Sequence, residues 1–166
     1  MAIQLVRVDF RLVHGQVVTK WIHTIKADTI LVVNDKLAND PFMLSVYQMS
    51  APMGTKVDVI KVDDFIAHWK ENKYEDVNCM VLIKNVEDTY RMFKEGVVFD
   101  AIQIGGLGGA AGRKAVFGPV TLDKTDAEQL KEINDSGQRV YFHQVPENGS
   151  AAFNDVMKGV VFDFFF

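Results

Sequence analysis

The architecture of this chain is set near its start, by Val8-Asp9-Phe10-Arg11-Leu12-Val13-His14-Gly15-Gln16-Val17. An apolar run at residues 3–8 precedes this segment and has the composition of a central β-strand covered on both faces. Val17, Trp21 and Ile25 follow at the spacing of an amphipathic helix. The sequence therefore predicts a strand that ends in a loop, and a loop that leads into a helix.

The rest of the chain repeats this alternation of strand and helix patterns. Such alternation predicts an α/β fold, with an open, mostly parallel, doubly wound sheet of about six or seven strands and helices on both faces. The predicted strands span residues 3–8, 29–34, 56–61, 78–84, 101–104 and 139–145, with a short extended piece at 116–120. The predicted helices include residues 16–26, 63 or 64 to about 71, 86 to about 96, and 150–157.

Two further helices are predicted from capping signals. Asp40 followed by Pro41 is a favourable helix start, and residues 51–54 end that helix. Thr125-Asp126-Ala127-Glu128 matches a capping box, so a helix is expected to begin at this segment. The side chains expected to face inward from the first of these two helices are those of Met43, Leu44, Tyr47 and Ala51.

Size and composition predict a single globular domain over residues 1–166, with an apolar tail at 159–166. Hydrophobic residues make up 48% and charged residues 24%, which indicates a folded chain. The tail is expected to pack on this core or on a neighbouring subunit, so a homodimer is left open. A net charge of −4 argues against a nucleic-acid surface, because affinity for the phosphate backbone depends on excess Lys and Arg.

Other features indicate a cytoplasmic protein. The single cysteine, Cys79, cannot form an internal disulfide and is expected to be a small buried hydrophobe. Arg7 and Asp9 interrupt the N-terminal apolar run, so it lacks the layout of a signal peptide. No uncharged stretch reaches the length of a membrane-spanning helix.

The loop around His14 is the candidate site. Free N–H groups at the helix start would stabilise an anion beside the histidine, and Arg11 offers a planar cation suited to phosphate oxygens. The same residues also fit an ordinary strand-to-helix turn. Ligands of open α/β sheets bind beyond the carboxyl ends of the strands, where the winding reverses. The residues that could line a cleft there are Arg7, Asn34, Asp35, Gly105 and Gly106. For Arg7, a supporting position behind the site is favoured.

Residues 7–17 resemble the R-[IV]-D-x-R-L-[IV]-H-G-Q-V signature of the IIB subunits in the mannose/fructose/sorbose class of the bacterial sugar phosphotransferase system (PTS). Further matches are Val32-Val33-Asn34-Asp35, Ala38-Asn39-Asp40, Ala51-Pro52-Met53-Gly54 and Ile102-Gln103-Ile104-Gly105-Gly106. The resemblance extends to about Pro146. This chain departs from it at Phe10, where family members commonly have a second acidic residue, in the insert at 106–114, and in its aromatic tail.

The resemblance implies a phosphoryl relay that needs no cofactor. A phosphorylated histidine of a IIA partner would pass its phosphoryl group to Nδ1 of His14. His14 would deliver it to a sugar held by the membrane subunits IIC and IID, with which this chain would associate peripherally. Arg11 and the N–H groups of Gly15 and Gln16 would stabilise the phosphoryl charge, while Asp9 would orient the loop. Gly15 would leave room for the partner histidine. The sugar stays open among mannose, fructose, sorbose and amino sugars such as N-acetylgalactosamine.

Two other functions stay open. One is a nucleotide- or dinucleotide-binding enzyme that uses the glycine-rich loop at 105–112, and the other is a non-catalytic regulatory module on the same fold. Gly106, Gly108 and Ala111 satisfy G-x-G-x-x-A, but no helix opens directly after them, as that motif requires. Arg113 and the following lysine instead suggest a cleft wall or a partner-binding loop. Neither an H-E-x-x-H motif nor a cysteine pair is present, so no metal site is expected.

Overall fold

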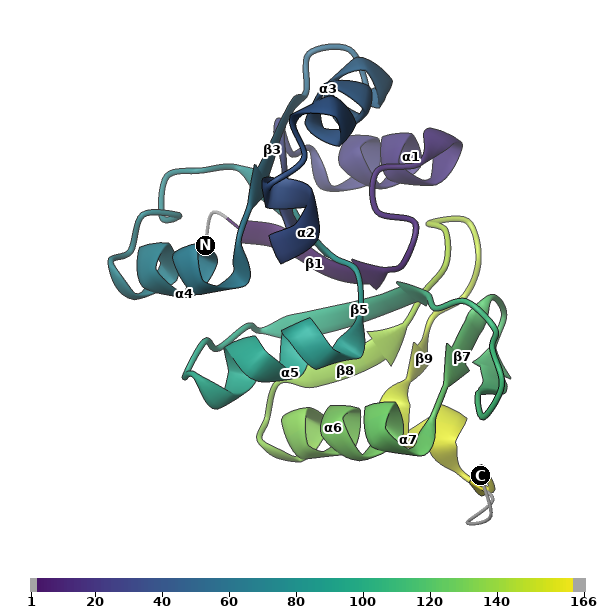
Figure 1. Cartoon of the computed structure of the whole chain (residues 1–166). Helices are drawn as coiled ribbons and strands as arrows, with labels where there is room; N and C mark the ends of the chain where they lie inside the picture. The colour runs from purple at the N-terminus through teal and green to yellow at the C-terminus, as the bar shows by residue number, and fades with distance from the viewer. Residues whose placement is uncertain (1–2, 163–166) are drawn as a thin grey trace.

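The computed structural model describes residues 3–162 and shows a seven-stranded sheet with helices on both faces (Figure 1). The strands of this sheet are β1 (Ile3–Asp9), β2 (Thr29–Val33), β3 (Lys56–Ile60), β4 (Cys79–Ile83), β5 (Ala101–Gly106), β8 (Arg139–Phe142) and β9 (Ala151–Ala152). A separate hairpin consists of β6 (Lys114–Phe117) and β7 (Val120–Leu122). The helices are α1 (Gly15–Ile25), α2 (Asp35–Ala38), α3 (Pro41–Ser50), α4 (Val62–Lys70), α5 (Val86–Lys94), α6 (Lys124–Asp135) and α7 (Phe153–Met157).

The order of the strands confirms the predicted fold class. They lie in the order β3-β2-β4-β1-β5-β8-β9, and neighbouring strands are parallel except for β9, which runs antiparallel to β8. β1 therefore lies near the middle, with Val8 aligned to Ile83 of β4 on one side and to Ile104 of β5 on the other. The chain leaves β1 for a helix on one face and leaves β4 for a helix on the other face. The loop after β1 thus lies where the winding reverses, which is the ligand-binding position in such sheets.

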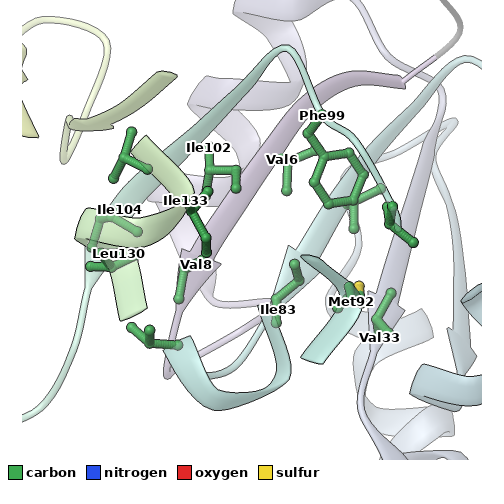
Figure 2. Close-up of a cluster of buried hydrophobic side chains, with 14 of the residues drawn as sticks. Val6, Val8, Val33, Ile83, Met92, Phe99, Ile102, Ile104, Leu130 and Ile133 are labelled. Carbon is green, nitrogen blue, oxygen red and sulfur yellow. The ribbon is translucent and has the colours of Figure 1, made fainter. Parts of the chain in front are cut away.

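Two hydrophobic clusters cover the two faces of the sheet. Val6 and Val8 of β1 pack towards α4, α5 and α6, together with residues such as Ile83 and Met92 (Figure 2). The other cluster contains Trp21 of α1 and alternate residues of β2 and β4. Because side chains alternate along a strand, the residues of β1 next to the two valines, Arg7 and Asp9, point to the α1 side. This alternation places two charged side chains beneath the loop that carries His14.

The start of α3 is as predicted, but its inward stripe is only half-buried. Asp40 caps the helix by accepting a hydrogen bond from the N–H of Met43 (3.1 Å), and Pro41 is the first helical residue. No residue of this helix is fully buried. Phe42 and Met49 are 75% and 86% exposed, so α3 covers the edge of the sheet rather than its centre.

Two helix starts were predicted at the wrong residue. α6 begins at Lys124, because Asp123 rather than Thr125 is its cap and accepts from the N–H of Asp126 (2.7 Å). α4 begins at Val62, and its first N–H donates to Asp35 Oδ1 (2.8 Å) from the loop after β2. A carboxylate distant in sequence thus caps this helix, and a local sequence pattern cannot predict such a cap.

The C-terminal third differs from prediction in several connections. The extended piece expected at 116–120 is a hairpin, because Gly118 takes a φ of 49° and turns the chain between β6 and β7. The last parallel strand ends at Phe142 instead of 145, and the final helix is shorter than expected and follows β9. Within the predicted tail, Phe162 packs against the core, and residues 163–166 lie outside the described part of the chain. Among the helices of residues 3–162, none has the length and apolar character needed to cross a bilayer.

Candidate active site

The loop between β1 and α1 is a tight turn held by backbone hydrogen bonds. The N–H of Leu12 donates to the carbonyl of Asp9 (3.0 Å), and the N–H of Phe10 donates to the carbonyl of Gly106 on β5 (3.0 Å). Leu12 has a φ of 54°, in the left-handed region that bulky residues seldom adopt. His14 is extended and occupies the N-cap position of α1. The turn brings the histidine back over the end of β1.

Asp9 is a fully buried carboxylate beneath this turn. Its Oδ2 accepts a hydrogen bond from Nη2 of Arg7 (3.1 Å), and its Oδ1 accepts from the backbone N–H of Arg11 (3.1 Å). Nε of Arg11 lies 3.4 Å from Oδ1, and Nε2 of His14 lies 3.7 Å from Oδ2. One carboxylate therefore contacts the turn, both arginines and the histidine.

Arg7 does not line a cleft, as had been left possible, because its side chain is only 1% exposed; it has the supporting position that was favoured for it. Its guanidinium donates from Nη1 to Gln103 Oε1 (2.6 Å) and to the carbonyl of His143 (2.9 Å). Nη2 donates to Asp9 and to the carbonyl of Gln144 (2.9 Å). Burial lowers the pKa of Arg7, while the adjacent Asp9 carboxylate raises it. Arg7 therefore ties the site to the chain that follows β8, and does not face a ligand.

The two glycines at the end of β5 form the floor of the site instead of an open wall. A Cβ on Gly105 would overlap the guanidinium of Arg7, and a Cβ on Gly106 would lie 3.2 Å from Oδ1 of Asp9. Both glycines are buried. Because neither residue has a side chain, the Arg7 guanidinium and the Asp9 carboxylate can occupy the volume beside this backbone.

The two ring nitrogens of His14 have different surroundings. Nδ1 lies 2.7 Å from the carbonyl of Leu12. A carbonyl only accepts, so Nδ1 carries the proton in this arrangement. Nε2 is buried, faces Asp9, and has no hydrogen-bond partner among residues 3–162. Burial lowers the pKa of His14 below its ordinary value, Asp9 raises it, and Arg11 and Arg7 lower it. The neutral ring, whose lone pair can act as a nucleophile, is therefore favoured near neutral pH.

Groups that can bind an anion surround the exposed side of the ring. The His14 side chain is 20% exposed and that of Arg11 is 37% exposed. The first N–H groups of α1, from Gly15 and Gln16, have no carbonyl one turn earlier to accept them, and the His14 side chain does not cap them. Gly15 is exposed, and a Cβ built on it meets no atom within 4 Å. The helix start is thus open to solvent beside the histidine.

Asn34 and Asp35 are not brought to His14 by any contact of the described residues. Asn34 is buried and caps α2 by accepting from the N–H of Leu37 (3.0 Å). Asp35 caps α4 and lies 3.3 Å from Nη1 of Arg91. Both residues follow β2, which is separated from β1 by β4. These contacts give both residues structural roles on that side of the sheet.

The glycine-rich loop lacks the helix start that the dinucleotide-binding motif needs. Residues 110–113 make a turn that leads into the hairpin, and no helix N-terminus follows β5 directly. Arg113 is bound within the fold: Nη2 donates to Asp126 Oδ2 (2.7 Å) and to the carbonyl of Thr121 (2.8 Å), while Nη1 lies 3.3 Å from Asp123 Oδ2. The guanidinium that could have contacted a phosphate therefore anchors the hairpin to α6. Among residues 3–162, no cluster of at least three His, Cys, Asp or Glu side chains could hold a metal ion.

Three residues of the site had not been assigned a role from the sequence. Gln103 accepts from Arg7, and its amide nitrogen lies 3.3 Å from the hydroxyl of Tyr141. Trp21 donates from Nε1 to the carbonyl of Gln144 (3.0 Å), which also accepts from Arg7. Gln103 did carry a signal, since it is a polar residue in an otherwise apolar strand. Gln144 acts through its backbone, which leaves no trace in sequence.

Comparisons with known proteins agree with the resemblance noted above. The family model described as "PTS system sorbose subfamily IIB component" matches residues 3–163. The sorbose-specific EIIB component of Klebsiella pneumoniae is 30% identical over 162 residues, which cover 98% of this chain and 99% of that protein. The mannose-specific EIIAB component of Escherichia coli is 29% identical over 160 residues, covering 96% of this chain and 50% of that protein.

A solved structure shows the same architecture. The crystal structure of the IIBSor domain of the sorbose permease from Klebsiella pneumoniae superposes with a TM-score of 0.89 at 30% identity. The match covers 98% of this chain and 100% of that chain.

Proposed function

The chain belongs to the sorbose subfamily of PTS IIB components, and from this membership we propose that His14 is its phosphoryl carrier. Members of this family are phosphotransferases of sugar transport systems, and the chain is a transferase of this kind. In our proposal His14 accepts a phosphoryl group from a phosphorylated IIA protein. It then passes the group to a sugar bound by the membrane subunits IIC and IID.

The single observation that supports this proposal is the convergence of charged and donor groups on one partly exposed imidazole. Asp9 contacts the ring from below, Arg11 lies at the surface, and the free N–H groups of Gly15 and Gln16 begin α1 beside it. Phosphoryl transfer depends mainly on positioning and on stabilising the charge of the equatorial oxygens. Arg11 and the helix start supply positive potential for that purpose. Gly15 leaves the approach open to a partner histidine.

The surroundings of the ring favour Nδ1 as the reacting nitrogen. Nε2 is sealed beside the Asp9 carboxylate, where a phosphoryl group would meet both a steric block and like charge. Nδ1 must first leave the Leu12 carbonyl and lose its proton, and the neutral ring then carries its proton on Nε2, facing Asp9. The Nδ1 lone pair forms the new N–P bond as the N–P bond of the donor histidine breaks. The donor imidazole keeps the electron pair of the broken bond.

The proposed partners follow from the relatives. The printed name of the mannose-specific relative joins IIA and IIB in one protein, which supports a IIA protein or domain as the donor for this chain. We propose that the chain docks on IIC and IID at the cytoplasmic side of the membrane, and that those subunits select the sugar. The relatives named for sorbose and mannose do not assign this chain's sugar.

The test is labelling with a radiolabelled phospho-IIA of the mannose or sorbose class. The wild-type protein is expected to take up one acid-labile, base-stable phosphoryl group, and His14→Ala is expected to take up none. His23→Ala is the matched control, because His23 is an exposed histidine on the same helix and is expected to label normally. Retained label in His14→Ala would refute the carrier role. No label on the wild type would favour the regulatory module, and nucleotide binding would favour the enzyme based on the glycine-rich loop.

A further inference from the structure

Phe10 is an exposed aromatic residue at the edge of the site, and the proposed phosphoryl transfer assigns it no part. It follows the buried Asp9 directly, and its side chain is 40% exposed. Its backbone N–H is fixed to the carbonyl of Gly106 (3.0 Å). The start of the side chain is therefore anchored, while the ring lies at the surface.

The ring of Phe10 contacts the guanidinium of Arg11. Cζ of Arg11 lies 5.7 Å from the ring centroid, within the range of a cation–π interaction. The guanidinium also contacts Asp9, but the distance from Nε to Oδ1 is long at 3.4 Å. A contact of this length, on a side chain that is 37% exposed, restrains the guanidinium weakly. Phe10 supplies a second point of contact for the Arg11 guanidinium.

The Phe10 ring also packs against the glycine-rich loop. A Cβ on Gly108 would lie 3.2 Å from Cε2 and 3.4 Å from Cζ of the ring, so the ring packs against the bare backbone there. That backbone is itself held, because the hydroxyl of Thr121 donates to the carbonyl of Gly108 (2.7 Å) and lies 3.1 Å from that of Leu107. The Phe10 ring thus contacts both a fixed loop and the Arg11 side chain.

We infer that Phe10 is a positioning residue for Arg11, and that the missing side chain of Gly108 is what allows it to act. The inference rests on the proposed function, in which Arg11 stabilises the transferring phosphoryl group. Phe10 touches neither the phosphoryl group nor His14 in this role; it limits the orientations of the guanidinium. An exposed cation–π contact corresponds to about a two- to fivefold change in rate, which is the size of effect expected.

The first test compares Phe10→Leu, Phe10→Tyr and Phe42→Leu in single-turnover transfer from phospho-IIA. Phe10→Leu is expected to lower the transfer rate about two- to fivefold at saturating phospho-IIA, and Phe10→Tyr is expected to restore it because the aromatic face is kept. Phe42→Leu is the matched control, since Phe42 is an exposed phenylalanine on α3. In an Arg11→Ala background, Phe10→Leu is expected to have no further effect, because its target is gone.

The second test uses two neighbouring glycines. Gly108→Ala is expected to shift the Phe10 ring slightly and to lower the transfer rate part of the way towards that of Phe10→Leu. It is expected to have no effect on the rate when Phe10 is already Leu. Gly109→Ala is the matched control, because a Cβ there meets no atom within 4 Å and neither glycine has a positive φ. An equal loss in both glycine variants, or a Gly108→Ala loss that persists in Phe10→Leu, would overturn the inference.

A third measurement does not depend on phosphoryl transfer. The ring current of Phe10 is expected to shift the side-chain proton resonances of Arg11, and the shift should disappear in Phe10→Leu and remain in Phe10→Tyr. If the wild type accepts no phosphoryl group, the proposed function fails even where this shift is present. If transfer is normal and the effects of Phe10→Leu and Arg11→Ala simply multiply, the inference fails while the proposed function stands.

Discussion

Replacing Gly105 by alanine should be one of the most damaging single-methyl changes in this protein. Gly105 lies at the end of β5, and its missing side chain leaves the space that the Arg7 guanidinium fills. An alanine Cβ would lie closer to that guanidinium than any two non-bonded atoms approach. Both the strand and the guanidinium are buried, so neither can move aside without losing contacts.

The magnitude follows from what Arg7 would lose. Its four hydrogen bonds, to Asp9, Gln103 and the carbonyls of His143 and Gln144, cannot all survive displacement. Breaking a buried ion pair by removing one partner typically costs about 3–5 kcal/mol, because the remaining charge stays buried without compensation. For a chain of this size, that corresponds to a fall in Tm of roughly 6–20 °C.

The assay is urea unfolding followed by circular dichroism, with thermal unfolding in parallel. Gly149→Ala is the control, because a Cβ there meets nothing within 4 Å. Arg7→Met removes the atoms with which the methyl group would clash, so Gly105→Ala should cost far less in that background than in the wild type. A Gly105→Ala protein within about 0.5 kcal/mol of the wild type would refute the reasoning. So would an equal cost in both backgrounds.

Three further predictions concern protonation and capping. Burial lowers the pKa of His14, so the rate of phosphoryl acceptance should stay level as the pH falls to the ordinary histidine pKa near 6.5 and decline only below that pH. Labelling for a fixed time at a series of pH values would show this. A decline that begins above pH 6.5 would contradict it. Burial raises the pKa of the Cys79 thiol to about 11, so iodoacetamide at pH 8 should label it only after unfolding, as mass spectrometry would detect. Because Asp123 caps α6, Asp123→Ala should destabilise the fold by about 1–2 kcal/mol, whereas Thr125→Ala should change stability by less than about 0.5 kcal/mol. Equal urea unfolding midpoints for the two variants would count against Asp123 as the cap.

The fold and the central residue of the site could be predicted from sequence because their signals are local. Buried parallel strands such as β2 and β4 are continuous apolar runs, and the helices between them have one apolar stripe each. The loop at His14 combines a strand end, a glycine and a helix start within a few residues. Its position at the edge of the sheet then follows from the alternation of strands and helices alone.

The burial of Arg7 could not be predicted in this way. Arginine is usually exposed, and the groups that satisfy this one include two backbone carbonyls more than 130 residues further along the chain. The useful signals were indirect: Arg7 and Asp9 share one face of β1, and Gly105 interrupts the neighbouring strand. The register between β1 and β5 is what brings the bare backbone of Gly105 against the Arg7 guanidinium, and a local pattern does not reveal that register.

Competing local signals explain the errors at helix starts. Asp123 and Thr125 are both good caps, and the chain uses the aspartate, which also pairs with Arg113. At α4 the first N–H is satisfied by Asp35 from another loop, so the same aspartate that had been expected near His14 has a different task. Capping patterns narrow a helix start to a few residues, and tertiary contacts decide among them.

The position of β1 between β4 and β5 has a consequence for biosynthesis. The signature is synthesised well before both neighbours of its strand. The bonds from Arg7 to His143 and Gln144 span 136 and 137 positions. Contacts this remote are closed slowly and last. A nascent or truncated chain that stops before residue 143 would contain the whole motif. Its Arg7 would still lack the hydrogen bonds to the carbonyls of His143 and Gln144. The site would thus be complete only after residues 143 and 144 have been made.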